Sequence, residues 1–210
     1  MNKYYLSSKK ITKKFGRRLI FKDLDFEFLA NGIYGITGIN GSGKSTLIKI
    51  IAGIISPSSG KIIHKFDENI IEPELLHNYI GFVAPYLIMY EEFSAWENLT
   101  HISNIRGVEF NTELFNSLLD DFLLLNRKDD MVKTYSSGMK QRLKFIFALM
   151  HSPKILLLDE PTSNLDDAGK EAVYRIIRRE GENKIVIIAS NENSDLDLCT
   201  AKIKLQDYKL

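Results

Sequence analysis

The sequence is poor in cysteine and contains no long apolar run. Its 210 residues include one cysteine, Cys199, which has no second cysteine to pair with inside the chain. An unpaired cysteine argues against a disulfide-stapled secreted scaffold and fits a reducing compartment. No apolar stretch approaches the length needed to cross a bilayer, and residues 1–10 lack the apolar core of a signal peptide. We therefore expect a cytoplasmic protein.

A strong net charge is also missing. Lys and Arg total 28 and Asp and Glu total 27, which gives a formal charge of +1 at pH 7. The whole molecule therefore has no field that would recruit nucleic acid, and we expect no nucleic-acid partner. A local basic cluster is open to two interpretations, a contact with lipid headgroups or nucleic acid, or a solvated strand-turn-strand, of which we favour the second. This basic cluster consists of Lys9, Lys10, Lys13, Lys14, Arg17, Arg18 and Lys22.

The composition is that of an ordinary globular protein, and its first and last thirds alternate strands and helices. Hydrophobic residues make up 44% and charged residues 26% of a chain whose length suits one domain with an insertion. Apolar runs bounded by turn residues predict strands at 24–28, 33–37, 61–64, 155–158 and 184–189. Helices are predicted at 44–52 and 168–179, and Gly181 is expected to end the second one.

The middle third is predicted to be helical. Ser94 and Glu97 form a capping box, which predicts a helix from 95 to about 105. Asn111 is expected to cap a second helix that runs to about 124. A third helix follows, and its expected apolar face is Met139, Leu143, Ile146, Phe147 and Met150. This helical insertion interrupts the strand-forming regions.

A glycine-rich segment between a predicted strand and a predicted helix carries the clearest chemical signal. Gly38 is followed after four residues by Gly43, Lys44 and Ser45, the spacing of a phosphate-binding loop. Such glycines let backbone amides converge on phosphate oxygens, while the lysine adds positive charge and the serine hydroxyl can hold Mg²⁺. An ordinary glycine turn would leave the lysine and the serine unexplained. The expected nucleotide-binding residues of this loop are Gly38, Asn40, Gly41, Ser42, Gly43, Lys44, Ser45 and Thr46.

Two acids end a strongly apolar predicted strand. Asp159 and Glu160 follow residues 155–158, and the carboxyl ends of parallel strands are where nucleotides bind. Asp159 would then hold Mg²⁺ together with Ser45, and Glu160 would polarise the attacking water as a catalytic carboxylate. A solvated acidic turn is the alternative for an isolated strand.

Four segments together resemble the ATP-binding cassette of ABC transporters. They are residues 38–45, 135–142, 155–161 and 163–166, and the resemblance extends from Tyr4 to about Leu205. It implies an α/β class with the P-loop NTPase ABC-ATPase fold, a mixed sheet core with an N-terminal antiparallel β subdomain and an inserted helical subdomain. The single domain would span 1–210, with 1–85 and 151–210 as the nucleotide-binding core and 86–150 as the helical subdomain.

The same resemblance implies that two copies share each ATP. Residues 135–142 would be the signature loop, whose Ser136 and Gly138 bind the γ-phosphate of ATP held by a second copy in a head-to-tail dimer. Asp166 would lie at the dimer interface beside the second copy's phosphate site. Phe15 would stack on adenine, although a single aromatic residue is also a common core residue.

The implied function is that of an ATP-binding and ATP-hydrolysing subunit, of export type, that powers transport through a separate integral membrane permease. ATP and Mg²⁺ would be its cofactors. The protein would be cytoplasmic and peripheral at the inner face of the cell membrane, held there by the permease. Two alternatives stay open, a soluble ABC-type ATPase not engaged in transport and a slow-hydrolysing clamp or regulatory subunit.

Departures from the family pattern bear on the rate of hydrolysis. Pro85 stands where a glutamine that contacts Mg²⁺ and water is usual, and proline offers no side-chain ligand. Asn191 stands where a histidine usually contacts the γ-phosphate, and its amide can still donate a hydrogen bond, with shorter reach and no proton to exchange. In the signature loop, Ser137 and Met139 replace the usual glycine and glutamine. We expect Glu160 and Asn191 to be the catalytic residues, with turnover below that of relatives.

An apolar segment follows Pro85. Residues 86–90, with Phe93 and Trp96, would suit a groove that receives a short helix of the membrane subunit. They would equally suit the core of the helical subdomain. Both interpretations stay open on the sequence.

Overall fold

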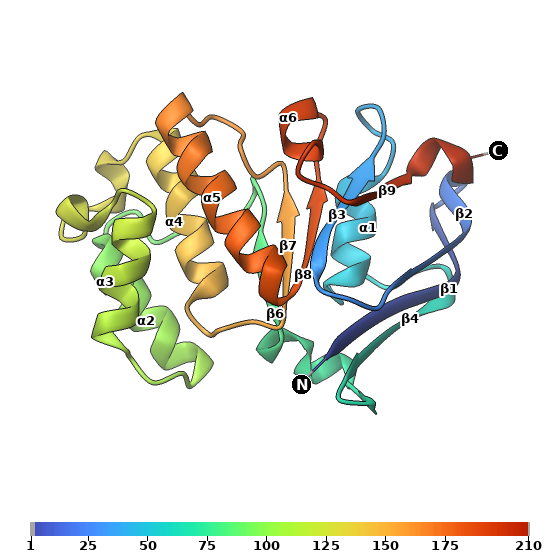
Figure 1. The fold of residues 1–210 in the computed structure, drawn as a ribbon, viewed down its shortest axis with the longest axis horizontal. Helices are drawn as coiled ribbons and strands as arrows, with labels where there is room; N and C mark the ends of the chain where they lie inside the picture. The colour runs from blue at the N-terminus through green and yellow to red at the C-terminus, as the bar shows by residue number, and fades with distance from the viewer. Residues whose placement is uncertain (1–2, 210) are drawn as a thin grey trace.

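The computed structural model describes residues 3–209 and builds them around a five-stranded parallel sheet (Figure 1). The strand order is β6-β7-β8-β3-β9, so a strand from the first third of the chain lies among strands from the last. Every neighbouring pair in this sheet is parallel. The strands are β3 (Gly32–Thr37), β6 (Ile80–Val83), β7 (Ile155–Asp159), β8 (Ile185–Ala189) and β9 (Ala201–Lys204).

A second, four-stranded sheet is antiparallel and comes from the N-terminal part of the chain. Its order is β2-β1-β4-β5, and each neighbouring pair runs antiparallel. In Figure 1 it lies to the right, beyond helix α1. The strands are β1 (Tyr4–Phe15), β2 (Arg18–Phe28), β4 (Ser59–Phe66) and β5 (Asn69–Ile70).

Helices pack on the parallel sheet, and α2 to α5 form the region to the left in Figure 1. Helix α1 packs on β7 and β8, α4 packs on β6, and α5 packs on β3 and β8. The α-helices are α1 (Lys44–Ile51), α2 (Ala95–Arg106), α3 (Thr112–Asp121), α4 (Ser137–Leu149), α5 (Asp167–Asn183) and α6 (Asn193–Leu196). Short 3-10 helices are η1 (Pro73–Asn78), η2 (Leu125–Arg127), η3 (Val132–Thr134) and η4 (Leu205–Tyr208).

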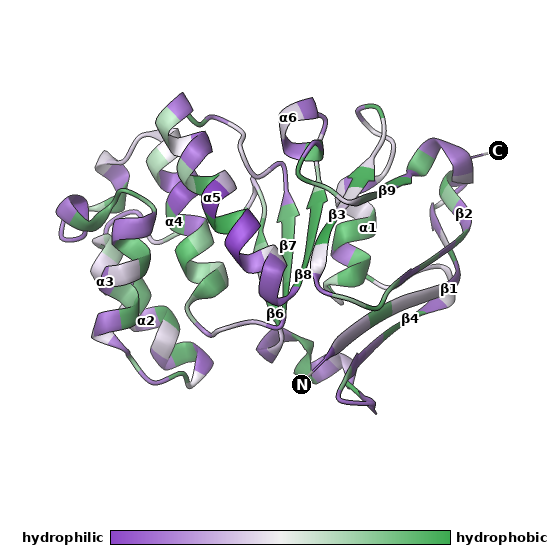
Figure 2. Cartoon of the chain, in the orientation of Figure 1, coloured by the Kyte–Doolittle hydropathy of each residue, from purple (hydrophilic) through white to green (hydrophobic). Residues whose placement is uncertain are grey.

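The parallel sheet separates two hydrophobic clusters because successive side chains of a strand point to opposite faces. Leu156 and Leu158 of β7 join one cluster with α4, α5 and the helices α2 and α3. Ile155 and Leu157 of the same strand join the other cluster with α1 and the antiparallel sheet. Figure 2 shows the central strands in the green of hydrophobic residues, while the outer helices alternate green with purple. Both faces of the sheet are therefore covered, as the continuous apolar strand sequences require.

The predicted fold class is confirmed. The core sheet, which was expected to be mixed, is parallel in every described pair. Antiparallel ladders occur in the N-terminal sheet, and one isolated antiparallel bridge joins Ser94 to Met131. Helices α2, α3 and α4 fall within the expected helical subdomain at 86–150. Because α4 also packs on β6 and shares a cluster with β7, the boundaries of that subdomain within the single domain 1–210 stay a prediction.

The capping box and the third helix follow the expected pattern with one difference. Helix α2 begins after Ser94, whose hydroxyl accepts from the Glu97 amide while the Glu97 carboxylate accepts from the Ser94 amide. Of the expected apolar face, Leu143, Ile146 and Met150 are buried, but Met139 and Phe147 are only partly buried. Buried Phe145 takes a place outside the expected stripe. The buried arc is wider than one stripe because α4 packs against α3 on one side and β6 on the other.

The expectation that Gly181 ends its helix is wrong. Helix α5 continues to Asn183, and Gly181 is buried inside its last turn. A Cβ atom added at residue 181 would lie 2.6 Å from Cγ1 of Ile33 on β3. The glycine therefore permits close approach of helix and sheet. A single glycine near the end of a helical segment looks the same in the sequence whether it ends the helix or permits such an approach.

The basic cluster lies on the β1–β2 hairpin, where all its members except Lys13 are exposed. Lys13 donates from Nζ to the backbone oxygen of Ser56 at 2.7 Å. This placement fits the solvated strand-turn-strand. Within residues 3–209, every helix is too short or too polar to cross a bilayer.

Gly181→Ala should destabilise the protein by about 1–3 kcal/mol, because the added methyl overpacks against Ile33. At an unobstructed interior helix position the same change stabilises by roughly 0.5–1 kcal/mol, so the sign of the effect is the test. The free energy of unfolding would be measured by urea titration. In the background of Ile33→Ala, which removes the obstructing atoms, the cost of Gly181→Ala should shrink. A stabilised Gly181→Ala protein would contradict the close-approach role.

Candidate nucleotide site

The predicted phosphate-binding loop connects β3 to α1, with the backbone conformation that such a loop needs. Gly43 caps the helix at φ +109°, and a Cβ atom there would lie 2.4 Å from Cγ2 of Ile20. Gly41, at φ +72°, has no atom within 4 Å of the place where a Cβ would stand. The loop is thus packed tightly on its inner side and open at Gly41. Free amides at the start of α1 follow it directly, the arrangement that binds anions.

Lys44 lies at the first turn of α1 with 6% of its surface exposed. Its ammonium donates to the backbone oxygen of Gly38 at 3.0 Å and to Oδ1 of Asn191 at 2.7 Å. Burial lowers the pKa of Lys44, while the charges of Glu160 and Asp159 act in the opposite direction. The buried hydroxyl of Ser42, also on the loop, has no hydrogen-bond partner. A phosphate group would supply acceptors to both side chains.

Ser45 and Asp159 meet where α1 starts and β7 ends. The Ser45 hydroxyl donates to Oδ1 of Asp159 at 3.0 Å. Burial raises the pKa of Asp159, and the Ser45 hydrogen bond and the charges of Lys49 and Lys44 oppose that shift. The serine and the carboxylate predicted from distant parts of the sequence therefore lie in contact.

The donor set suits Mg²⁺ with few protein ligands. A hydroxyl and a carboxylate offer only oxygen atoms, and Mg²⁺ prefers oxygen and keeps several waters or substrate phosphates. Among the described residues no cluster of three or more His, Cys, Asp or Glu side chains could hold a metal. Ser45 and Asp159 thus fit a cation that a bound triphosphate would help to coordinate, and do not form a closed protein cage.

Glu160 follows Asp159 in a left-handed backbone conformation, at φ +49°. Non-glycine residues rarely adopt this region, and it costs of order 1–3 kcal/mol unless the surroundings impose it. The Glu160 amide donates to the oxygen of Ala189 on β8 at 2.8 Å, which ties the turn to the neighbouring strand. The turn directs the carboxylate toward the residues that follow β8, where Ser190 Oγ lies 3.2 Å from Oε2. Burial raises the pKa of Glu160.

Asn191 connects the two sides of the candidate site. Its Oδ1 accepts from Lys44, and its Nδ2 donates to Oε1 of Glu160 at 3.0 Å and to Oδ1 of Asn40 on the loop. The structure therefore brings Asn40, Lys44, Glu160 and Asn191 into one hydrogen-bonded cluster. Thr46 lies in the first turn of α1, partly buried, and has no side-chain hydrogen bond to this cluster.

The signature-loop residues lie at the start of α4. The Ser136 hydroxyl accepts from the Met139 amide at 3.2 Å and caps the helix. A Cβ atom at Gly138 would lie 2.9 Å from the Asn164 carbonyl oxygen, so the helix start packs against the loop that leads to Asp166. Asp166 caps α5 by accepting from the Gly169 amide at 3.0 Å. None of these residues has a hydrogen bond to the phosphate loop in the described part of the chain.

Phe15 ends β1 with 51% of its surface exposed, outside both hydrophobic clusters. The alternative that it is a core residue is therefore wrong. The Lys13 ammonium lies 4.7 Å from the centre of the Phe15 ring. The ring is free to stack against a planar group, although no contact joins it to the phosphate loop.

The turn after β6 carries Pro85, which is exposed and presents no side-chain ligand. Its carbonyl oxygen accepts from the buried Lys144 ammonium of α4 at 2.8 Å. The next residue is Tyr86. Burial, and to a smaller extent the charge of Asp159, raise the pKa of Tyr86 to about 12. Lys49 of α1 lies 4.1 Å from the centre of the Tyr86 ring.

Three functional candidates escaped the sequence patterns. Gln141 of α4 is buried and donates to the backbone oxygen of Pro161 at 3.0 Å, immediately after Glu160. Ser190 and Asp195 are buried and hydrogen-bonded to each other beside Glu160. Ser190 could have been noticed from its place at the end of a strand. Asp195 carries no local signal because its partners come from three other segments.

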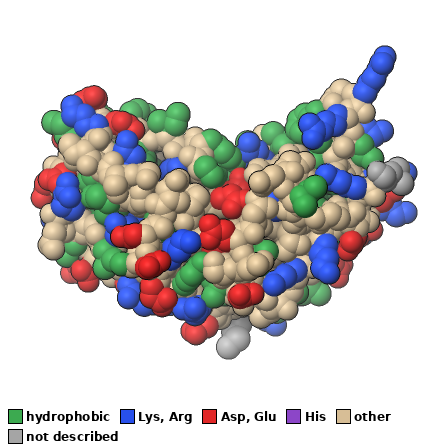
Figure 3. Space-filling view, turned by 90° about the horizontal axis from the view of Figure 1, so that it is seen from above, with side chains coloured by type: hydrophobic (Ala, Val, Ile, Leu, Met, Phe, Trp, Pro, Cys, Tyr) green, Lys and Arg blue, Asp and Glu red, His purple; other side chains and the backbone are tan. Residues whose placement is uncertain are grey.

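The arrows of β7 and β8 point to the upper face in Figure 1, so the turns that follow these two strands lie at that face. Figure 3 looks onto that face. Its surface is hollowed between two lobes, and Asp and Glu side chains gather in the hollow. A depression of about 480 Å³ lies beside the loop and is lined in part by Gly38, Ser190 and Asn191.

Comparison with known proteins agrees with this geometry. The sequence model of the family described as ABC transporter matches residues 21–163. The uncharacterized ABC transporter ATP-binding protein YdbJ of Bacillus subtilis (strain 168) is 34% identical over 93% of this chain, which spans 64% of that relative's length. The lantibiotic transport ATP-binding protein SrtF of Streptococcus pyogenes is 34% identical, and the match covers 91% of this chain and 82% of the length of SrtF.

Solved structures show the same fold. An ABC transporter ATP-binding protein from Pyrococcus furiosus gives a TM-score of 0.84 at 24% identity and covers 98% of this chain and 100% of its own. An ATP-binding cassette solved as a dimer in a post-hydrolysis state with ADP and Pi gives 0.81 at 22% identity, with coverage of 95% and 93%. From the family match and the two relatives, the chain belongs to the ABC transporter family, as an ATP-binding domain.

Proposed function

We propose that the chain binds ATP with Mg²⁺ and hydrolyses it as the energy-supplying subunit of an ABC transporter. The main support is the convergence of Lys44, Glu160 and Asn191 in one hydrogen-bonded cluster beside the Ser45–Asp159 pair. Lys44 supplies a cation that can bind phosphate, Glu160 supplies a carboxylate that can bind water, and Asn191 is hydrogen-bonded to both. A phosphate loop without the carboxylate would support binding alone.

Lys44 and the loop amides would bind the triphosphate. In this structure the Lys44 ammonium donates to Asn191, and a phosphate oxygen is the stronger acceptor because it is charged. The open face at Gly41 gives phosphate oxygens access to the backbone. Ser45 and Asp159 would hold Mg²⁺, which when bound supplies positive charge for the phosphate oxygens during transfer.

Glu160 would accept a hydrogen bond, and then a proton, from the attacking water. Both of its carboxylate oxygens accept hydrogen bonds, Oε1 from Asn191 Nδ2 and Oε2 from Ser190 Oγ and, at 3.5 Å, from the Asn191 amide. A carboxylate fixed in this way loses little orientational freedom during the reaction. The burial that raises its pKa also favours acceptance of a proton.

A second copy would complete the site. Gly138 packs against the Asn164 carbonyl, two residues before Asp166. Within residues 3–209, Ser136, Gly138 and Asp166 have no hydrogen bond to the phosphate loop of their own chain. The start of α4 offers helix amides that favour a phosphate group. A head-to-tail dimer with ATP between the copies uses both halves, and one structural neighbour was solved as a dimer.

The membrane-embedded permease subunit would dock beside Pro85 and hold the protein at the inner face of the membrane. Ile88 is 92% exposed, and Tyr86, Tyr90 and Phe93 are also substantially exposed, whereas Met89 is buried. Most of this segment therefore faces solvent and does not fill the helical core. Exposed apolar side chains on one short segment are typical of a surface that receives an apolar helix. We call these four exposed residues the docking segment.

A slow-hydrolysing clamp is the second candidate, because Pro85 provides no ligand and Asn191 cannot exchange a proton. Steady turnover with MgATP separates the two functions, since a clamp would dimerise with ATP without releasing phosphate. A soluble ATPase that acts outside transport has no feature of the structure in its favour.

Glu160→Gln should lower kcat at least 100-fold and leave ATP affinity within about twofold, because an amide fits the site and cannot take a proton. Phosphate release and calorimetric ATP binding would measure the two quantities. With hydrolysis blocked, size-exclusion chromatography should show an ATP-dependent dimer. Glu192→Gln, whose carboxylate pairs with Lys170 at 3.1 Å, is the matched control and should remain active. Unchanged turnover in Glu160→Gln would exclude the catalytic role.

Asn191→Ala should lower kcat about tenfold or more, since a hydrogen bond to a charged group contributes roughly 1.5–3 kcal/mol. Asn191→His, which introduces the residue usual in the family pattern, should raise kcat several-fold above the natural protein. Both would be measured as phosphate release over a range of ATP concentrations, with the exposed neighbour Asn193→Ala as control. If all of these proteins turn over at one rate, Asn191 does not limit hydrolysis.

Ile88→Asp should abolish association with the permease and leave the ATPase rate of the isolated protein unchanged, because it places a charge in the apolar contact. The measurement is co-purification in detergent with the multi-span membrane protein that the natural protein captures from its own membranes. Ile105→Asp, on α2 and 74% exposed, is the control and should still co-purify. Equal recovery of both variants would refute the docking segment.

A further inference from the structure

Asp195 is a buried carboxylate that the hydrolysis mechanism above does not use. It lies on the short helix α6, and 1% of its surface is exposed. A charged group at this depth is costly unless it is hydrogen-bonded. No Lys or Arg of the described residues forms an ion pair with it, because the nearby Lys170 pairs with Glu192 instead.

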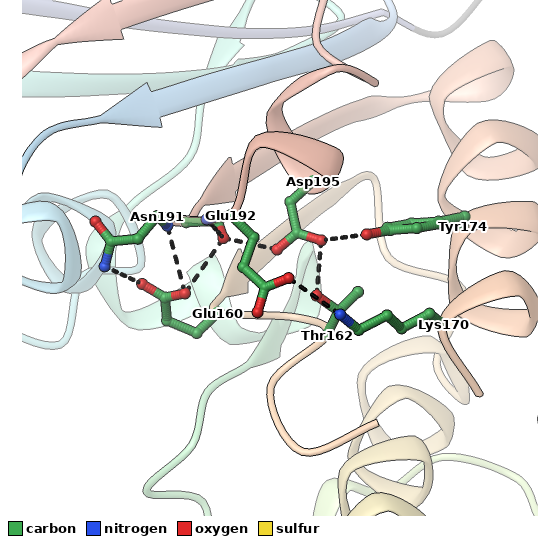
Figure 4. Close-up of polar contacts among 8 residues, drawn as sticks. Glu160, Thr162, Lys170, Tyr174, Asn191, Glu192 and Asp195 are labelled. Atoms are coloured by element: carbon green, nitrogen blue, oxygen red, sulfur yellow. Dashed lines mark hydrogen bonds and ion pairs between the residues drawn. The ribbon is translucent and has the colours of Figure 1, made fainter. Parts of the chain in front are cut away.

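Three hydroxyl groups satisfy this carboxylate, and they divide between its two oxygens (Figure 4). Oδ1 accepts from Thr162 Oγ1 at 2.8 Å and from the Tyr174 hydroxyl at 2.9 Å. Oδ2 accepts from Ser190 Oγ at 2.6 Å. Oδ1 therefore binds two hydroxyl groups that do not contact Glu160, whereas Oδ2 binds Ser190, which does contact Glu160.

Ser190 contacts both Glu160 and Asp195, and it is fully buried. Its Oγ lies 3.2 Å from Oε2 of Glu160 and also accepts from the Glu192 amide at 3.0 Å. A hydroxyl has a single proton, so it cannot donate fully to both carboxylates at once. The two carboxylates therefore share the proton in a bifurcated hydrogen bond, whose stronger branch, to Asp195 at 2.6 Å, fixes the serine rotamer and whose weaker branch reaches Glu160 at 3.2 Å.

We propose that Asp195 is a positioning residue for ATP hydrolysis, which holds the Ser190 hydroxyl so that the weaker branch of its shared hydrogen bond fixes the orientation of the Glu160 carboxylate. This inference rests on the proposed ATPase function. The strained turn at Glu160 fixes only its backbone, and Asn191 holds Oε1 with its side chain but reaches Oε2 only with its backbone amide, at 3.5 Å. Ser190 supplies the closer contact at Oε2, and Asp195 supplies the constraint on Ser190.

The division between the two oxygens of Asp195 separates a positioning role from a merely structural one. Asp195→Asn keeps the volume and replaces an acceptor by an NH₂ group, which mispairs with hydroxyl donors. Ser190→Ala removes the contact with Glu160. Tyr174→Phe removes a hydrogen bond to Oδ1 and leaves the Oδ2–Ser190–Glu160 path intact. A structural role predicts loss in proportion to stability, whereas the positioning role predicts loss only along that path.

The test measures kcat, KM and the affinity for MgATP of these variants in the full chain, together with the midpoint of thermal unfolding. We expect Asp195→Asn and Ser190→Ala each to lower kcat at least tenfold with ATP affinity within twofold, since misplacement of a reacting group by about 1 Å costs on the order of 100-fold. Tyr174→Phe should keep kcat within twofold even where its unfolding midpoint falls. The double variant Asp195→Asn/Ser190→Ala should be no slower than Ser190→Ala alone.

Opposite outcomes overturn the proposal. Full kcat in Asp195→Asn, a kcat loss in Tyr174→Phe that matches its stability loss, or additive losses in the double variant would each assign Asp195 a structural role. If Asp195→Asn does not fold, Asp195→Ser replaces it, and Ser190→Ala with Tyr174→Phe still discriminates. Absence of MgATP hydrolysis by the natural protein would refute the proposed function itself, a result distinct from activity that the variants leave unchanged.

Discussion

The register of three parallel strands determines which side chains can meet. Ile36 of β3 and Asp159 of β7 both pair with Ala189 of β8, so these strands end at one level of the sheet. The loops that follow start side by side, although they come from positions far apart in the chain. A shift by one residue would turn every side chain of the shifted strand to the opposite face. Burial on both faces forbids such a shift, so packing of the sheet also fixes the geometry of the site.

Two charged side chains of the site are buried, and hydrogen bonds within the site offset the cost of burying them. Lys44 and Asp159 are nearly covered, and burial lowers the pKa of the first and raises the pKa of the second. Each has hydrogen bonds in place, Lys44 to Gly38 and Asn191, and Asp159 to Ser45. These internal bonds satisfy the groups in the absence of nucleotide. Phosphate binding then exchanges one set of partners for another and exposes no charged group without a partner.

Local spacing was sufficient to propose those groups of the candidate site that lie within one segment. The loop residues and the pair Asp159 and Glu160 were found because each depends on neighbours in sequence, and the apolar strands were found because their burial is continuous. Gly181 was misinterpreted because a helix stop and a close approach to Ile33 leave the same single-glycine pattern. Asp195 was missed because Thr162, Tyr174 and Ser190 converge on it only after β7, α5 and β8 have packed.

Helix α4 holds two of the turns that border the site. Gln141 donates to the carbonyl of Pro161 after β7, and Lys144 donates to the carbonyl of Pro85 after β6. These two residues are three apart, so they project from one side of the helix. The signature residues stand at the first turn of the same rigid cylinder. A rotation or translation of α4 would therefore displace both turns together. The helix thus couples a contact at its first turn to the position of the Glu160 carboxylate.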